Sequence, residues 1–192
     1  EELVNDMSIR DGVAIRYAGE DDIVRVISYR EFAEMIRAEA LNVKSDRSVV
    51  EVIRDEQDPG TLVNIFAHVM AGCDIILADP MVPEEITARA SKAAEASKAA
   101  REAMPGGKGE GELLFFTSGT TSSSKIVRLT SQSFCTSALS GQSMLACGED
   151  DVILSILPLA HVFGFVCSML WGLAYGATIA LGRGVRHLVD DA

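Results

Sequence analysis

Short apolar runs rich in β-branched residues alternate with longer segments in which apolar residues recur at helical spacing. The runs predict strands at residues 12–17, 22–28, 48–54, 73–80, 113–117, 125–129, 152–157 and 177–181. Helical patterns follow several of them, at residues 29–41, 59–72, from 84 onward, 131–146 and 162–174. Strands that alternate with helices favour an α/β fold, with layered, mostly parallel sheets flanked by helices.

Turn and capping residues support these boundaries. The stretch "AGED" joins the first two strands and predicts a hairpin. Ser28 precedes one helical pattern and Asp58 precedes another, where Pro59 takes the first helical position. Both polar side chains are expected to cap their helices, because a Ser or Asp oxygen accepts from amides that the first turn leaves unpaired.

A glycine-rich stretch, "MPGGKGEGE" at 104–112, is the best candidate for an internal boundary. It predicts a first α/β subdomain at 1–104, a linker at 105–112 and an incomplete second α/β segment at 113–192. The helix before the linker is alanine-rich and weakly amphipathic, so we expect it to be exposed.

Charge and cysteine content narrow the range of partners. The 192 residues carry a formal net charge of -11, which argues against nucleic acid or an anionic membrane as the main partner. The four cysteines are widely spaced and form no Cys/His cluster, so we expect reduced thiols, no metal site and a cytoplasmic protein. The first ten residues are acidic and do not resemble a signal peptide.

The segment 152–181 contains no Asp, Glu, Lys or Arg and is long enough to cross a bilayer. Pro158, Gly172 and Gly176 interrupt it, however, and a β-branched run follows the last glycine. A buried helix followed by a buried strand explains the same residues, so no membrane span is expected. A membrane anchor through this segment is the alternative.

The polar loop between the strands at 113–117 and 125–129 is the main candidate for chemistry. Its spacing from Gly119 to Lys125 approaches that of a P-loop, but Ser124 replaces the second glycine and Ile126 replaces the hydroxyl that holds magnesium. A nucleoside-triphosphatase loop is therefore disfavoured. A loop whose amides and hydroxyls surround phosphate oxygens, with the lysine as counter-charge, remains consistent with the residues.

The stretch "FTSGTTSSSK" resembles the phosphate loop of the adenylate-forming (AMP-binding) superfamily, in which acyl-CoA synthetases have approximately [FY]-T-S-G-[ST]-T-G-x-P-K-G. Downstream, "SILPLAHVFGF" (155–165) resembles the P-L-x-H-x-x-G segment of that family, and "YGATIALG" resembles the strand that follows. "ISYREFAEMI" and "AHVMAGCDIILADPMVPEEI" resemble earlier family segments in the same order. The resemblance covers most of residues 10–182.

The resemblance implies the N-terminal part of a ligase that activates a carboxylic acid with ATP to an acyl-adenylate and transfers the acyl group to CoA or a carrier thiol. It implies ATP, Mg2+ and CoA as cofactors, and a cytoplasmic role in fatty acid metabolism. The positions that match the phosphate loop are Thr117, Ser118, Gly119, Thr120, Thr121 and Lys125. The positions implied for the acyl pocket are His161, Phe163 and Gly164.

The chain also departs from the family pattern. Ser122, Ser124 and Ile126 stand where the family has glycine, proline and glycine. The Thr-Glu motif and the C-terminal domain with the catalytic lysine have no counterpart, and Ile179 stands where a motif-like "YGATI" would need glutamate. We therefore assign no catalytic residue and expect an N-terminal fragment that is inactive alone. The alternative is a non-catalytic binding or scaffold module derived from the same fold.

Two other histidines are interpreted as structural. His68 lies on an apolar helical pattern and is expected to be a core histidine, and His187 near the end of the sequence is expected at the surface.

Overall fold

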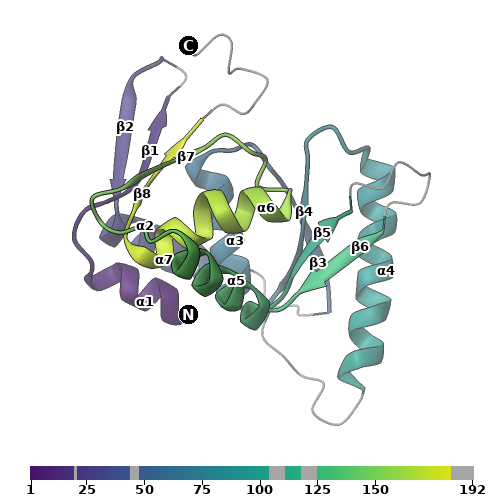
Figure 1. Cartoon of the computed structure of the whole chain (residues 1–192). Coiled ribbons are helices and arrows are strands. Elements are labelled where there is room, and N and C mark those ends of the chain that lie inside the picture. The colour runs from purple at the N-terminus through teal and green to yellow at the C-terminus, as the bar shows by residue number, and fades with distance from the viewer. Residues whose placement is uncertain (20, 44–47, 104–110, 118–124, 183–192) are drawn as a thin grey trace.

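The computed structural model describes residues 1–19, 21–43, 48–103, 111–117 and 125–182. Within these residues the strands form two four-stranded sheets, with helices between them and on their outer faces (Figure 1). Sheet A has the order β2-β1-β8-β7 and sheet B the order β3-β4-β5-β6. The predicted class, an α/β fold with mostly parallel sheets flanked by helices, is confirmed.

The strands of sheet A are β1 (Val13–Ala18), β2 (Val24–Ser28), β7 (Val152–Ser155) and β8 (Thr178–Leu181). The predicted hairpin is present, because β1 pairs with β2 in antiparallel orientation. β8 runs parallel to both β1 and β7. Sheet A therefore joins strands from the two ends of the sequence.

The strands of sheet B are β3 (Val50–Arg54), β4 (Asp74–Ala78), β5 (Leu113–Phe116) and β6 (Ile126–Leu129). The first three are parallel, and β6 is antiparallel to β5. The carboxyl ends of β3, β4 and β5 thus meet at one edge of the sheet, where β6 begins. This edge is called the carboxyl edge of sheet B below.

The helices are α1 (Glu2–Ile9), α2 (Tyr29–Asn42), α3 (Pro59–Met70), α4 (Glu84–Glu102), α5 (Ser131–Met144), α6 (Val162–Phe165) and α7 (Trp171–Tyr175), with a π-helical segment (Val166–Leu170) between the last two. The sequence patterns did not predict α1. Both predicted caps are confirmed. Ser28 forms a reciprocal capping box with Glu31, and Asp58 accepts from the amide of Thr61 at 2.6 Å.

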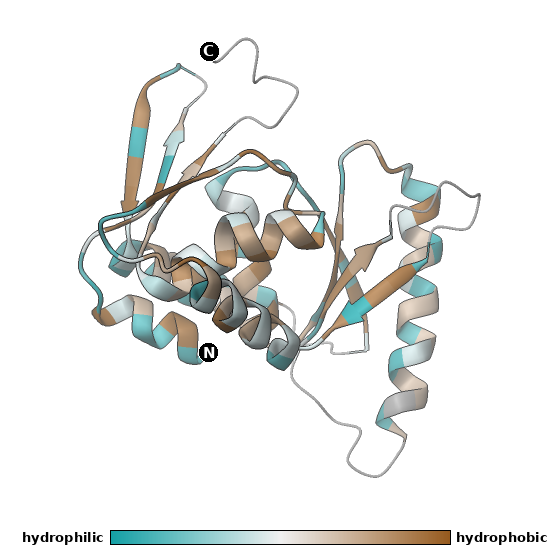
Figure 2. Ribbon diagram, in the orientation of Figure 1, coloured by the Kyte–Doolittle hydropathy of each residue, from teal (hydrophilic) through white to brown (hydrophobic). Residues whose placement is uncertain are grey.

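The main apolar core lies between the two sheets, around α2, α3, α5 and the 162–175 helix (Figure 1). Phe115 of β5, Phe134 of α5 and Phe165 of α6 contact one another with ring centroids 5.5–6.2 Å apart. Apolar residues are concentrated in the strands and in the helices between the sheets, whereas α4 alternates polar and apolar residues (Figure 2). The aromatic cluster fixes α6 against sheet B.

Helix α4 covers the outer face of sheet B (Figure 1). Ala90 and Ala94 form a second apolar cluster with Val50, Ile76 and Leu114 of the sheet. The expectation of an exposed helix is therefore wrong for this face. Small alanine side chains let a helix approach a sheet closely, so a weak apolar periodicity is enough to bury one stripe.

Residues 152–181 form strand β7, the 162–175 helix and strand β8, as the buried-helix interpretation predicted. Among the described residues, no helix is long and apolar enough to cross a membrane. Residues 104–110, in the predicted linker region, lie outside the described residues. Strands from both sides of it pair in each sheet, and the division of the chain at 105–112 stays a prediction.

Candidate functional site

Polar residues gather where the chain leaves sheet B. Asp55 follows β3, Asp79 follows β4 and Thr117 follows β5, all at the carboxyl edge. Lys125 precedes β6 and reaches the same edge, because β6 is antiparallel to β5. Open α/β sheets bind their ligands beyond the carboxyl ends of parallel strands, so this edge is the candidate site.

The two ends of the predicted phosphate loop are held together. The amide of Thr117 donates to the carbonyl of Lys125 at 2.9 Å, which extends the β5–β6 pairing by one step beyond Phe116 and Ile126. Thr117 is half-buried and Lys125 is exposed. The other predicted phosphate-binding residues lie outside the described residues, namely Ser118, Gly119, Thr120 and Thr121. The loop therefore starts and ends at adjacent points of the carboxyl edge.

The segment that carries the predicted histidine crosses from sheet A to this same edge. After β7 the chain passes through Leu157 and Ala160 before α6 begins. The amide of Ala160 donates to a carboxylate oxygen of Asp55 at 2.9 Å. The side-chain amide of Gln57 donates to the carbonyl of Leu157, also at 2.9 Å. The 157–160 segment is thus bonded to the residues that follow β3.

His161 is the N-cap residue of α6. Its Nδ1 accepts from the amide of Phe163 at 3.4 Å, and its own amide donates to the carbonyl of Pro158 at 3.0 Å. A neutral imidazole that accepts at Nδ1 carries its proton on Nε2, where it can act as a donor. The His161 ring is exposed, so that Nε2–H group is open to a ligand.

The two other residues predicted for the acyl pocket differ in exposure. The Phe163 side chain is 57% exposed. Gly164 is buried, and a Cβ on it would lie 2.3 Å from the carbonyl oxygen of Pro158 and 3.1 Å from the Cβ of Leu157. The glycine of this motif therefore permits α6 to start directly against the 157–160 segment.

Asp55 and Gln57 contribute to this edge but were not predicted from the sequence. Asp55 is 3% exposed, and its burial raises the pKa of its carboxyl, an effect that the amides of Ala160 and Gln57 oppose. The signal was the polar stretch "RDEQD" directly after a predicted buried strand. Polar residues in that position of an α/β sheet mark the ligand-binding edge.

A positive charge at the carboxyl edge can attract an anionic ligand. The exposed Lys125 supplies a positive charge beside the half-buried Thr117. No group of three His, Cys, Asp or Glu with metal-ligand geometry occurs among the described residues. Mg2+ needs no such group when phosphate oxygens and water complete its shell.

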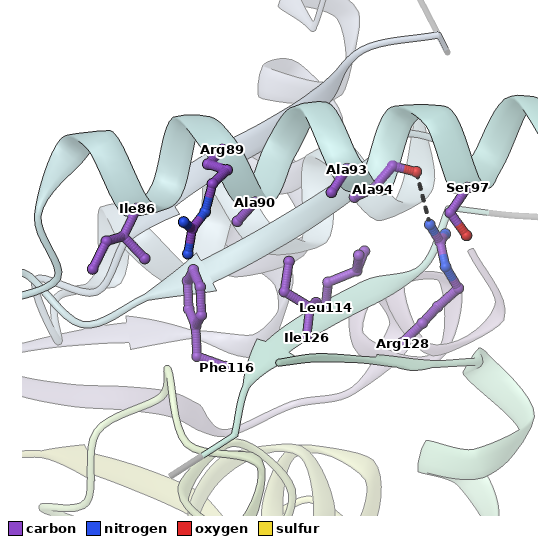
Figure 3. Close-up of a pocket in the computed structure, with 10 residues that line it drawn as sticks. All are labelled: Ile86, Arg89, Ala90, Ala93, Ala94, Ser97, Leu114, Phe116, Ile126 and Arg128. Carbon is purple, nitrogen blue, oxygen red and sulfur yellow. Dashed lines mark hydrogen bonds between the residues drawn. The ribbon is translucent and has the colours of Figure 1, made fainter. Parts of the chain in front are cut away.

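A groove of about 340 Å³ lies on the other side of sheet B, between α4 and strands β5 and β6 (Figure 3). Its floor is mainly apolar, and Phe116 and Ile126 border it directly next to the two ends of the loop. The guanidinium of Arg128 contributes to the lining while donating to the carbonyl of Ala94 at 3.3 Å (Figure 3). None of the predicted site residues that the structure describes lines this groove.

Known proteins share both the sequence pattern and the fold. The profile of the family described as AMP-binding enzyme matches residues 49–192. The chain is 36% identical over 84 residues to long chain acyl-CoA synthetase 2 of Arabidopsis thaliana, which covers 41% of this chain and 12% of that protein. It is 38% identical over 76 residues to the human mitochondrial malonate–CoA ligase, which covers 40% of this chain and 13% of that protein.

A solved structure extends the likeness to almost all of the chain. The o-succinylbenzoate-CoA synthetase of Bacillus subtilis, in complex with its acyl-adenylate intermediate, superimposes with a TM-score of 0.73 over 98% of this chain. Identity is 20%, so this match shows the fold alone, and the chain spans 46% of that protein. The sequence match and the two-sheet fold confirm the predicted resemblance, and the chain belongs to the family of AMP-binding, adenylate-forming enzymes.

Proposed function

We propose that the protein carrying this chain is an AMP-forming acid–thiol ligase. It would condense ATP with a carboxylic acid to an acyl-adenylate and pyrophosphate, and then transfer the acyl group to the thiol of CoA or of a carrier. The observation that carries this proposal is the convergence at the carboxyl edge of sheet B. There the loop ends at Thr117 and Lys125 are bonded to each other, and the segment before His161 is bonded to Asp55 and Gln57, which follow β3.

The loop is proposed to bind the β- and γ-phosphates of ATP through Thr117, Ser118, Gly119, Thr120, Thr121 and Lys125. The paired ends at Thr117 and Lys125 support this role, because they bring the first and last of these residues together. The ammonium of Lys125 would neutralise charge that develops on the departing pyrophosphate. Mg2+ would be held mainly by phosphate oxygens.

His161, Phe163 and Gly164 are proposed to border the acyl pocket. The exposed ring of Phe163 offers an apolar surface, and Nε2–H of His161 offers a hydrogen-bond donor for a carboxylate or acyl oxygen. Gly164 contributes by allowing the close approach of α6 to Pro158. The proposed substrate side therefore combines one polar and one apolar side chain at the start of a single helix.

We propose further that the 192-residue chain alone is inactive and that the protein works in fatty acid metabolism in the cytoplasm. The matched stretches cover 12–13% of the two curated relatives, and the chain covers 46% of the solved chain, which supports the first point. A non-catalytic binding or scaffold role is the second candidate. The loop residues Ser122, Ser124 and Ile126, which depart from the family pattern, favour it.

Substrate-dependent pyrophosphate exchange on the intact protein tests the proposal. Curated relatives include a malonate, an oxalate and a long chain acyl-CoA ligase, so the acids should include short dicarboxylates, long-chain acids and aromatic acids. We expect exchange with at least one acid, and none with the 192-residue chain alone. ATP binding without exchange for any acid would favour the scaffold role.

A further inference from the structure

Asp55 directly follows β3 of sheet B and also contacts the 157–160 segment. Its amide donates to the carbonyl of Ala78 at 3.0 Å, which continues the β3–β4 pairing. Its buried carboxylate accepts from the amides of Gln57 at 3.1 Å and Ala160 at 2.9 Å. A carboxylate that is withdrawn from water and accepts two backbone amides fixes the positions of both amides, because each lost bond would leave a buried group unpaired.

Gln57 makes the second contact from a strained backbone. Its φ is +50°, a left-handed conformation that residues with a Cβ seldom adopt. The hydrogen bond from its amide to Asp55 holds this turn, and its side-chain amide donates to the carbonyl of Leu157 at 2.9 Å. The strain is retained where it supports a contact between residues 100 positions apart in the sequence.

These bonds bracket the segment immediately before His161. The carbonyl of Leu157 is held at one end and the amide of Ala160 at the other. Between them the Leu159 side chain is fully buried, and the carbonyl of Pro158 accepts from the amide of His161. The backbone at His161 is thereby fixed relative to the carboxyl edge of sheet B.

We infer that Asp55 and Gln57 are positioning residues for acid activation. They hold the 157–160 segment so that His161 faces the ligand bound at the carboxyl edge of sheet B. The effect on activity rests on the proposed function, whereas the effect on the segment does not. Neither side chain is proposed to touch the reacting atoms.

The first test is hydrogen–deuterium exchange of the intact protein, read in peptides that cover residues 155–163. Asp55→Asn and Gln57→Met each remove one contact with little change in volume. We expect amides of this segment to exchange about tenfold faster or more in both variants. Peptides from β4 serve as the internal control, and Glu56→Gln serves as the matched variant because that exposed side chain is not bonded to the segment. Unchanged exchange in Gln57→Met, which keeps the buried carboxylate, would overturn the inference.

The second test is the kinetics of pyrophosphate exchange with the acid that reacts fastest. We expect KM for the acid to rise about tenfold in Gln57→Met, with KM for ATP unchanged, since a loosened segment misplaces the acid side of the site. A loss of folded protein alone would lower kcat and leave both KM values unchanged. Faster deuterium exchange with unchanged kinetics would overturn the positioning role. Absence of pyrophosphate exchange in the unmodified protein would instead contradict the proposed function.

Discussion

The ammonium of Lys98 lies 3.5 Å from a carboxylate oxygen of Asp74, and both side chains are almost completely buried between α4 and sheet B. Arg128 and Glu112 extend this pair, because Arg128 bonds to Asp74 and lies 2.8 Å from Glu112. Among the described residues, the Lys98 ammonium finds no hydrogen-bond partner, so its interaction with Asp74 is mainly Coulombic. This cluster anchors the C-terminal half of α4 to β4 and β6.

Substitutions within the buried cluster are expected to lower the free energy of unfolding by different amounts. Asp74→Ala leaves Lys98 and Arg128 without their shared carboxylate, and we expect a loss of about 3–5 kcal/mol in the free energy of unfolding. Lys98→Met leaves Asp74 bonded to Arg128 and is expected to cost about 1–3 kcal/mol. Urea unfolding measures both, with the exposed Lys92→Met on the same helix as the control. Equal costs for all three variants would contradict the prediction.

Gly164 is predicted to tolerate no side chain. A Cβ there would lie 2.3 Å from the carbonyl oxygen of Pro158, so Gly164→Ala must displace α6 or the 157–160 segment. We expect the free energy of unfolding, measured by thermal denaturation, to fall by about 1–3 kcal/mol. Gly141→Ala in α5 is the control. Its new Cβ would lie 3.7 Å from Trp171, and helix propensity predicts a gain of about 0.5–1 kcal/mol. A neutral Gly164→Ala would refute the close contact.

The buried hydroxyl of Tyr29 is expected to make the free energy of unfolding depend on pH above about pH 10. Burial raises the pKa of its hydroxyl to about 12, and the hydroxyl donates to the carbonyl of Ala177 at 2.7 Å. The folded state retains this proton when the unfolded chain loses it near pH 10, so stability falls as pH rises from about 10 to 12. Tyr29→Phe should remove this contribution and cost about 1–2 kcal/mol at neutral pH. Urea unfolding from pH 7 to pH 11.5 measures both effects. A Tyr29→Phe curve parallel to the unmodified one would contradict the assignment.

Replacing Lys125 is expected to raise KM for ATP. Under the proposed function, Lys125→Ala removes a charge-assisted contact with phosphate, and we expect KM for ATP in pyrophosphate exchange to rise about tenfold or more. KM for the carboxylic acid should stay within about twofold, because uniform loss of ATP binding leaves the acid contacts intact. Lys92→Ala, an exposed lysine on α4, is the control for a change in net charge. An unchanged KM and rate would remove Lys125 from the site.

Local chemistry explains which elements the sequence could predict. Ser28 and Asp58 cap their helices through contacts only three residues away, and the hairpin of β1 and β2 needs only a short turn. Such features depend on neighbours in the chain, so the spacing of residues is sufficient to identify them. Thr117, Lys125 and His161 were identified differently, through the resemblance of two short motifs to those of the adenylate-forming family.

The features that could not be predicted from the sequence depend on contacts between distant residues. The amphipathic pattern of α4 was too weak to reveal that Ala90 and Ala94 pack on sheet B. Asp55 and Gln57 looked like ordinary polar loop residues, because nothing in the sequence shows that their partners lie 105 and 100 residues away. A hydrogen bond over that separation depends on how the two sheets pack against each other, and that packing is a property of the whole core.

The sequence by itself therefore determined the order of the strands and of the helices after α1, two helix caps, the family and the residues of the two motifs. Only the tertiary structure decided that the loop ends and the 157–160 segment both lie at the carboxyl edge of sheet B, and that a buried carboxylate holds the 157–160 segment there. The physical reason is that periodicity and capping are short-range preferences of the backbone. The placement of Asp55 against Ala160 is instead fixed by burial, which is shared among residues from the whole chain.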